Sequence, residues 1–279
     1  MSDAGPVLPP GYTLYHLPLV GSTNDEAKSL ARNGAPAGTI VWADAQSAGR
    51  GRRGREWHSP AGNLYLSLIQ RPGGQPAAAA QLSFVTAVAL ADALTDIASD
   101  RAGSSSSQPS GPGSRGEGQG EGQAPRLNHA ILVKWPNDVL INGSKVAGIL
   151  LESETAGDGV IDFVVIGVGV NIAQAPEAPE YPATSLVREG MIGITGGTLL
   201  GSFIAAFDAR ARQWRHDGFP AIRDAWLSRA TGIGQNIRVR LDRSTLHGKF
   251  VALDQDGALI LQAPDGVRRI TAGAVFPAA

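Results

Sequence analysis

The spacing of hydrophobic and polar residues changes several times along this chain, and each change marks an expected element. Short apolar runs rich in β-branched and aromatic residues predict strands, and apolar residues three or four positions apart predict helices. Strands are expected at 39–43, 64–69, 130–135, 138–141, 144–154 and 160–172. Helices are expected at 21–35, 76–99 and 198–217, with a short one around Ile222 and Trp226.

Two of the expected helices carry specific signals. Thr23 and Glu26 have the T-x-x-E spacing of a capping box, and Gly34 stands where the first helix would end. In the helix at 76–99, Pro76 suits the first turn, and the apolar residues fall on one face: Leu82, Val85, Ala89, Leu94 and Ile97. No apolar run in the sequence approaches the length of a membrane span, so we expect no membrane segment.

Turn residues connect the middle strands. Asn142-Gly143 is a strong signal for a two-residue hairpin, and Gly157 to Gly159 predict the next turn. The three strands that these turns join should form an antiparallel meander.

Residues 101–125 interrupt this pattern. Glycine, serine and proline make up most of this segment, which cannot bury enough apolar area to offset the entropy lost on ordering. We interpret it as a disordered insertion within a domain, because a strand-like run resumes directly after it. A linker between two domains is the alternative.

The last forty or so residues have a different pattern, with short strand-like runs and no helical periodicity. Four short strand-like runs begin at Ile237, and Asp256-Gly257 and Asp265-Gly266 supply hairpin turns. They predict a small all-β unit, a barrel of the SH3 kind. We therefore expect an α+β chain, with residues 1–232 forming one domain and 233–279 a second.

Composition narrows the class of function. The formal net charge is −1, whereas proteins that bind nucleic acid usually carry an excess of basic residues. Cysteine is absent, which excludes a thiolate nucleophile, a disulfide framework and a cysteine-ligated metal. The N-terminus has no signal-peptide pattern, so a cytoplasmic protein is the expectation.

The stretch AGRGRRGREW, residues 48–57, concentrates positive charge in a glycine-rich run. It matches G-x-G-x-x-G literally, but it leads to a strand and not to a helix, so a dinucleotide site is not expected. Glycines let the backbone approach a ligand, and guanidinium groups bind carboxylate and phosphate. With no matching acids nearby, we favour a loop that closes on an anionic ligand. A basic nucleic-acid arm and a plain surface loop are the alternatives.

Three further groups combine polar chemistry with an apolar setting. Residues 134–138 (Lys-Trp-Pro-Asn-Asp) follow a strand, and Asp138 is a candidate for holding Mg²⁺ together with phosphates. Lys145 enters an apolar strand directly after the tight turn. Gly167 and Gly169 lie within a strand before Asn171, which implies close approach of a ligand or of another backbone.

Together these motifs resemble the biotin–protein ligases (EC 6.3.4.15). The resemblance covers residues 15–276 and rests on five motifs in order: Ser22-Thr23-Asn24, Gly49–Trp57, Lys134–Asp138, Lys145–Leu150 and Gly167–Asn171. It implies a mixed sheet flanked by helices, related to class II aminoacyl-tRNA synthetases, followed by an SH3-like domain. It also implies ATP and biotin as substrates with Mg²⁺, formation of biotinyl-5′-AMP, and transfer of biotin to a lysine of a carrier domain.

The resemblance assigns roles to residues. Those implied to bind biotin are Ser22, Thr23, Asn24, Gln46, Arg50, Gly51, Arg52, Lys145 and Gly148. Those implied to bind ATP or the adenylate are Arg52, Arg55, Trp57, Asn137, Gly167, Gly169 and Asn171. Those implied to be catalytic are Arg52, Lys145, Lys134 and Asp138, the last also as a metal ligand.

The implied partner is the biotin carboxyl carrier domain of acetyl-CoA carboxylase or of a related carboxylase, and two copies of the chain could pair. Only about fifteen residues precede the match, which leaves no room for the DNA-binding domain of some bacterial members, so no DNA partner is expected. A lipoate–protein ligase, a nucleic-acid-binding protein and an inactive biotin-binding module remain as alternatives.

Overall fold

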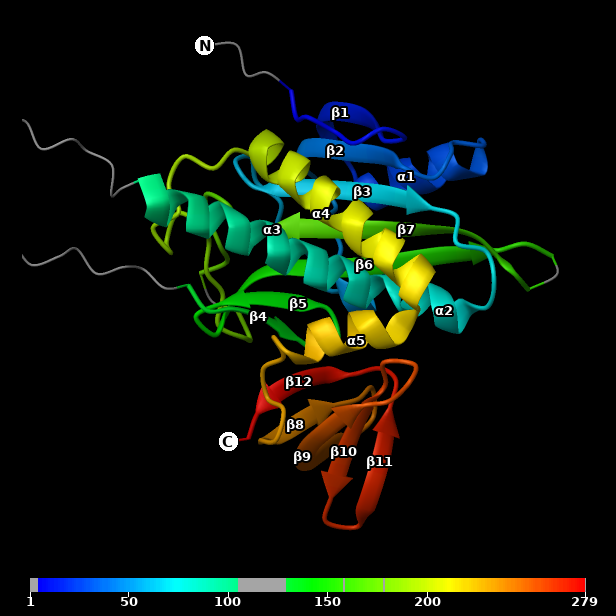
Figure 1. The fold of residues 1–279 in the computed structure, drawn as a ribbon, viewed down its shortest axis with the longest axis vertical. Coiled ribbons are helices and arrows are strands. Elements are labelled where there is room, and N and C mark those ends of the chain that lie inside the picture. The colour runs from blue at the N-terminus through cyan, green and yellow to red at the C-terminus, as the bar shows by residue number, and fades with distance from the viewer. Residues whose placement is uncertain (1–4, 105–128, 158, 178, 279) are drawn as a thin grey trace, which may run out of the picture.

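The computed structural model describes residues 5–104, 129–157, 159–177 and 179–278, which form a larger body above a small C-terminal unit (Figure 1). Of the segment expected to be a disordered insertion, only residues 101–104 are described, and they continue a helix. The rest of that prediction lies outside the described residues.

A seven-stranded sheet forms the centre of the larger body, in the order β1-β2-β3-β7-β6-β5-β4. Its strands are β1 (Thr13–Val20), β2 (Thr39–Gln46), β3 (Leu64–Gln70), β4 (Ile131–Lys134), β5 (Asp138–Ile141), β6 (Ser144–Thr155) and β7 (Ile161–Val170). Strand β1 pairs with β2 in parallel and every other pairing is antiparallel. The predicted mixed sheet is therefore confirmed, although β1 itself was not predicted.

Helices cover both faces of this sheet. Helix α1 (Thr23–Arg32) packs on one face, against Val41, Ile69, Phe163 and Val165. Helices α3 (Leu82–Ser104), α4 (Gly196–Asp217) and α5 (Phe219–Leu227) lie on the opposite face, and α2 (Pro76–Ala80) precedes α3 (Figure 1). Strand β3 is consequently buried along both faces, despite its alternating sequence.

Two helix predictions need correction. The capping box at Thr23 and Glu26 does not form: Ser22 is the N-cap residue, and the Thr23 amide donates to Gln46 Oε1. Residues 82–94 of helix α3 are buried on nearly all sides and not on one face, whereas the following residues to Arg101 are largely exposed. Among the described helices, the stretch Pro76–Arg101 is long and apolar enough to cross a membrane, but 72% of its apolar window is buried inside the fold. It is a core helix.

The predicted meander is confirmed, since β5, β6 and β7 pair in sequence order. Asn142 and Gly143 adopt φ values of 50° and 81° at the first turn, the left-handed pair that a tight hairpin requires. This turn fixes the position at which Lys145 enters β6.

The C-terminal unit is an antiparallel sheet in the order β11-β10-β9-β8-β12. Its strands are β8 (Asn236–Arg240), β9 (Thr245–Leu253), β10 (Leu259–Ala263), β11 (Gly266–Ile270) and β12 (Ala274–Pro277). Trp135 Nε1 donates to the carbonyl of Gly257 at 3.1 Å, which anchors this unit to the body. The small all-β unit is confirmed, while its closure into a barrel and the domain boundary at residue 232 stay predictions.

Candidate functional site

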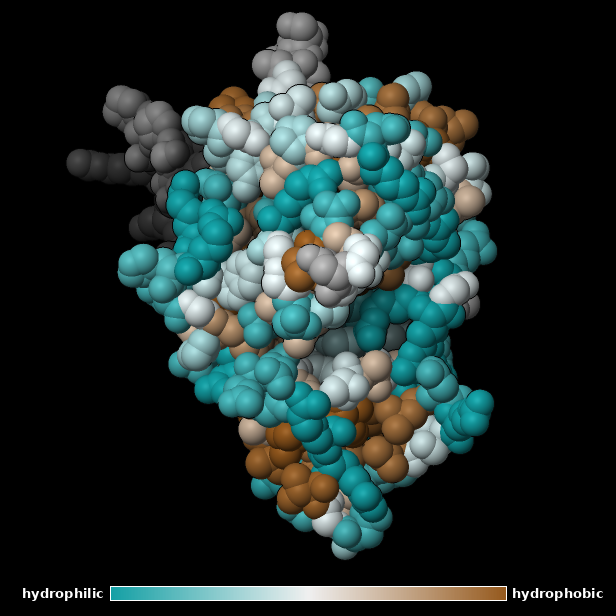
Figure 2. Space-filling view, turned by 90° about the vertical axis from the view of Figure 1, so that its right-hand side faces the viewer, coloured by the Kyte–Doolittle hydropathy of each residue, from teal (hydrophilic) through white to brown (hydrophobic). Residues whose placement is uncertain are grey.

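A cavity of about 540 Å³ lies against the α1 face of the sheet, between the loop Gly49–Trp57 (the arginine loop) and the C-terminal unit. Figure 2 shows the surface hollowed between the larger body and this unit, with hydrophilic side chains around the hollow. Every site residue expected from the sequence lines this cavity. Motifs more than a hundred residues apart are thus brought together, although their individual roles stay predictions.

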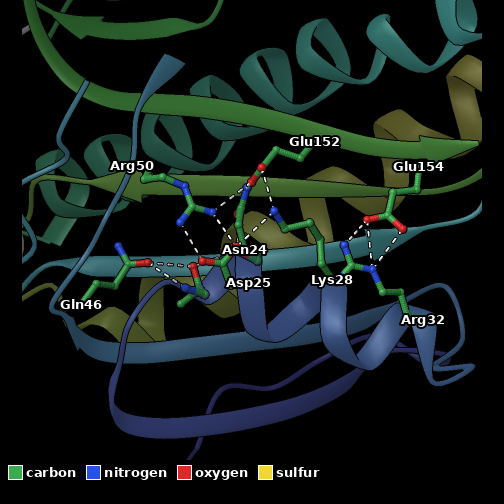
Figure 3. Close-up of polar contacts among 10 residues, drawn as sticks. Asn24, Asp25, Lys28, Arg32, Gln46, Arg50, Glu152 and Glu154 are labelled. Carbon is green, nitrogen blue, oxygen red and sulfur yellow. Dashed lines mark hydrogen bonds and ion pairs between the residues drawn. The ribbon is translucent and has the colours of Figure 1, made fainter. Parts of the chain in front are cut away.

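The start of α1 and the end of β2 build the polar end of the cavity (Figure 3). Gln46 Oε1 accepts from the Thr23 amide at 2.8 Å and from Thr23 Oγ1 at 3.1 Å, and Gln46 Nε2 donates to Ser59 Oγ at 2.9 Å. Asn24 donates to Glu152 Oε2 at 2.6 Å and accepts from Ser67 Oγ at 2.6 Å. Ser22, Thr23 and Asn24 are buried, so these donors and acceptors are fixed in place.

Three glycines make room for larger side chains. A Cβ on Gly169 would lie 2.6 Å from the Trp57 indole, and one on Gly148 would lie 2.9 Å from the same ring. A Cβ on Gly167 would overlap the Asn24 amide. The sequence predicted close approach of a ligand or of another backbone at Gly167 and Gly169; the groups that approach them here are instead the side chains of Asn24 and Trp57. Trp57 Nε1 is buried and has no hydrogen-bond partner in the described part of the chain.

Asp138 joins two lysines at the centre of the cavity. Its carboxylate lies 2.6 Å from Lys145 Nζ and 2.9 Å from Lys134 Nζ. Burial by itself would raise the pKa of Asp138, but the two ammonium groups outweigh it and hold that pKa below its usual value. Burial also lowers the pKa of Lys134, against the opposing effect of Asp138.

Aromatic rings complete the surroundings of these lysines. Lys134 Nζ lies 3.7 Å from the centre of the Tyr181 ring, and Lys145 Nζ lies 5.2 Å from the centre of the Trp57 ring. Both distances suit cation–π attraction. The cluster therefore holds two cations and one anion in a largely apolar setting, with a net positive charge available to an anionic ligand.

The arginine loop is not free of matching acids, which corrects the interpretation of the sequence. Arg50 pairs with Asp25 at 2.6 Å, Arg53 with Asp242 at 3.3 Å and Arg55 with Glu180 at 3.4 Å. These carboxylates come from α1, the C-terminal unit and the segment between β7 and α4, so sequence proximity could not reveal them.

Arg52 is the exception within the described residues, because it has no carboxylate partner there. Its guanidinium donates to Asn137 Oδ1 at 3.2 Å and to the Gly273 carbonyl at 3.5 Å. Burial, reinforced by Arg53, lowers the pKa of Arg52. A cation that lines a cavity and lacks an anion is well suited to receive one from a ligand.

The residues present do not fit a metal at Asp138. Both carboxylate oxygens of Asp138 are engaged by ammonium groups, and the described residues contain no group of three or more histidines, aspartates or glutamates that could hold a metal ion. The expectation that Asp138 is a metal ligand is therefore not supported by its surroundings.

Several lining residues were missed at the sequence level. Tyr181 and Glu180 come from the segment between β7 and α4, and Ala274, Val275 and Phe276 come from β12. The Val275 carbonyl accepts from Lys134 Nζ at 3.4 Å. Backbone carbonyls and apolar side chains carry no motif, so nothing in the sequence marks the C-terminal unit as part of the cavity wall.

Asn171, an expected adenine contact, is 4% exposed, and its amide donates to the Thr184 carbonyl at 3.1 Å. This bond ties the end of β7 to the segment that carries Tyr181.

Comparison with known protein families gives two matches. Residues 17–171 match the model described as "Biotin/lipoate A/B protein ligase family", and residues 232–276 match "Biotin protein ligase C terminal domain". The first match covers more than half of the chain, and the second coincides with the C-terminal sheet.

Individual proteins show the same relationship. The chain is 43% identical over 260 residues to "Biotin--[acetyl-CoA-carboxylase] ligase" of Paracoccus denitrificans, which covers 91% of this chain and 96% of that protein. It is 34% identical to "Bifunctional ligase/repressor BirA" of Bacillus subtilis, covering 93% of this chain and 72% of that protein. The solved structure of the Aquifex aeolicus biotin protein ligase with biotin and ATP has the same fold, with a TM-score of 0.72, 23% identity and coverage of 95% and 99%.

Proposed function

The chain belongs to the biotin/lipoate A/B protein ligase family, and from this premise we propose that it activates biotin with ATP and transfers it to a lysine of a carrier domain. Membership of this family, and its similarity to a biotin–[acetyl-CoA-carboxylase] ligase, make it a biotin–protein ligase (EC 6.3.4.15). The observation that carries the proposal is one cavity that joins a fixed hydrogen-bonding end to a cationic centre.

The polar end suits the ureido ring of biotin. That ring presents two N–H donors and one carbonyl, and this end of the cavity offers the side chains of Ser22, Thr23 and Gln46 together with the backbone of Gly51. Asn24 and Gly148 line the same region. In this arrangement the biotin carboxylate extends toward Lys145.

The cationic centre suits the phosphates of ATP. Arg52, Lys134 and Lys145 supply positive charge, with Asn137 and Asp138 orienting them. The indole of Trp57, packed over Gly169, suits the adenine ring, and Gly167, Asn171 and Arg55 line the same cavity. Mg²⁺ would enter as part of the MgATP substrate.

The chemistry explains why these residue types are needed. A biotin carboxylate oxygen attacks the α-phosphorus, the bond to pyrophosphate breaks, and biotinyl-5′-AMP results. The two anions repel each other, so cations must bring them together and neutralise the charge that builds at the phosphorus. The carrier lysine then attacks the acyl carbon, AMP leaves, and an amide forms as the amine loses a proton.

We further propose a biotin carboxyl carrier domain of acetyl-CoA carboxylase, or of a related carboxylase, as the partner. The printed name of the Paracoccus relative supports this choice. A cytoplasmic location, the absence of DNA from its partners and the pairing of two copies belong to the same proposal.

Mass spectrometry of the product tests the proposal. The protein is incubated with MgATP, biotin and a biotin carboxyl carrier domain, and the carrier should gain one biotinyl group at a single lysine. A parallel reaction with lipoate and a lipoyl domain tests the rival ligase. Modification of the lipoyl domain without modification of the biotin carrier would overturn the assignment.

A further inference from the structure

The arginine loop folds as a tight unit. The Gly51 amide donates to the Arg55 carbonyl at 2.7 Å, and the Trp57 amide donates to the Gly49 carbonyl at 2.9 Å. Because these bonds cross the loop, a contact at one of its residues positions the others, including Arg52 and Trp57.

One such contact lies at the biotin end. Arg50 Nη1 and Nη2 each lie 2.6 Å from a separate oxygen of Asp25 (Figure 3). This is the bidentate geometry that makes an arginine–carboxylate pair directional and strong. Asp25 lies in the first turn of α1, directly after the buried Asn24, so the loop is fastened to the element that shapes the biotin end.

The Asp25 carboxylate is itself held in place by neighbouring charges. Lys28 Nζ bridges Asp25 at 3.1 Å and Glu152 at 2.9 Å, and Glu152 also lies 3.7 Å from Arg50. The Arg50 hydrogen bond lowers the pKa of Asp25 to about 2, against the opposing effect of burial. The carboxylate is therefore charged at every pH at which an enzyme of this class works.

The ion pairs of the arginine loop affect how it closes. The arginines would repel one another if they stood alone, and closure would then require an anionic ligand. Here the chain's own carboxylates neutralise Arg50 and Arg53, and Arg55 shares Glu180 with Arg240. The loop can close over the cavity before the adenylate forms and stay closed until the carrier arrives.

We propose that Asp25 is a positioning residue that latches Arg50, keeps the arginine loop closed over the biotin end, and retains biotinyl-5′-AMP between the two half-reactions. The retention part rests on the proposed function. The latch itself does not, because it is a property of the ligand-free protein.

The first test uses limited trypsin digestion of the ligand-free protein. Asp25→Asn keeps the size and removes the charge, and cleavage at Arg50 to Arg55 should be accelerated about fivefold, as expected for loss of a well-formed surface pair. Asp25→Glu should restore slow cleavage. The matched control is Glu154→Gln. It breaks the Arg32–Glu154 pair between α1 and β6 and leaves the arginine loop untouched. Cleavage of the loop in this variant should equal that of the wild type.

The second test measures retention of the adenylate. Protein loaded with MgATP and biotin is desalted, and release of biotinyl-5′-AMP is followed without carrier. Asp25→Asn should release it about fivefold faster and raise the KM for biotin more than it lowers kcat, whereas Glu154→Gln should do neither. Trypsin cleavage and release both at the wild-type rate in Asp25→Asn would overturn the proposal. If the wild type forms no adenylate, the proposed function fails, and the trypsin comparison still decides on the latch.

Discussion

Lys145 Nζ and Asp138 Oδ1 lie 2.6 Å apart, although β6 delivers the lysine and β5 delivers the aspartate. The pair forms because the Asn142-Gly143 turn places the two strands side by side, with Asp138 opposite Gly148 and Lys145 opposite Leu140. Lys134 occupies the other oxygen of the same carboxylate. A ligand carboxylate or phosphate that enters the cavity therefore meets cations whose positions are already fixed.

Replacing Lys145 should impair adenylation strongly. Lys145→Gln keeps length and hydrogen bonding but removes the charge, and loss of one preorganised charge-stabilising group costs about 3–4 kcal/mol, or roughly a hundred- to thousandfold in rate. Lys145→Arg should not restore the rate, because a planar fork does not replace a compact ammonium. Pyrophosphate release at saturating biotin and ATP measures this. Activity of Lys145→Gln within a fewfold of the wild type would show that Lys145 is an ordinary strand lysine.

Replacing Asp138 should lower stability as well as activity. Asp138→Asn leaves two ammonium groups close together without their carboxylate, and Lys134 is 7% exposed. Breaking a buried pair costs about 3–5 kcal/mol, with the lower end expected here because the Lys145 side chain is one-quarter exposed. The free energy of unfolding from urea titration at pH 7 is the measurement.

The same variant has a predictable pH dependence. The pKa of Asp138 lies below its usual value in the folded protein and near 3.9, roughly, in the unfolded chain. Its stabilising contribution is therefore fully present above the unfolded value and is lost as the pH falls through the folded value. The stability difference between wild type and Asp138→Asn should begin to narrow below about pH 5 and should narrow further as the pH falls toward the folded pKa. A difference that stays constant over this range would contradict the charge assignment.

Much of the fold follows from local patterns, and the exceptions have physical reasons. The meander was predictable because the Asn142-Gly143 turn and the flanking apolar runs agree with each other. Strand β1 was missed because it is an edge strand with mostly exposed or half-exposed residues, so it has no apolar signature. The capping box failed because Gln46, distant in sequence, takes the Thr23 amide.

The site was predictable where its residues form contiguous motifs. The partners of those residues were not, because an ion pair such as Arg53–Asp242 joins positions that only the tertiary fold brings together. The contribution of β12 was invisible for another reason: the Val275 carbonyl is a backbone group that any residue would supply.

A single methyl group at Gly169 should weaken ATP binding. The new Cβ would lie 2.6 Å from the Trp57 indole, and overpacking of this kind costs about 1–3 kcal/mol. If Trp57 moves aside, the KM for ATP should rise about ten- to a hundredfold in a pyrophosphate-release assay. Gly157→Ala is the matched control, since its Cβ would meet nothing within 4 Å. An unchanged KM for ATP in Gly169→Ala would show that Trp57 does not contact the nucleotide.

Shortening the segment between α3 and β4 should be harmless. Because α3 continues to Ser104, the replacement should begin at residue 105 and exchange 105–122 for a short Gly-Ser linker. Loop-closure entropy changes by only about 0.6 kcal/mol per doubling of length. The melting temperature and the ligation rate should both match the wild type, and a large loss of either would show that this segment packs or binds.

Arg52 and Arg53 are neighbours in one loop, and they should respond very differently to the same substitution. Arg53 pairs with Asp242, which is 80% exposed, and exposed pairs contribute about 0–1 kcal/mol, so Arg53→Gln should adenylate biotin within a fewfold of the wild type. Both arginines line the cavity, but Arg52 has no carboxylate partner among the described residues, so its charge is available to the phosphates. Arg52→Gln should lower the adenylation rate roughly a hundred- to thousandfold, as for other preorganised charge-stabilising groups. Both variants remove one guanidinium from the same loop, so a difference between their rates reports on position and not on net charge. Equal rates for the two variants would show that the loop acts only through its total charge, and the assignment of Arg52 to the reacting phosphate would then be wrong.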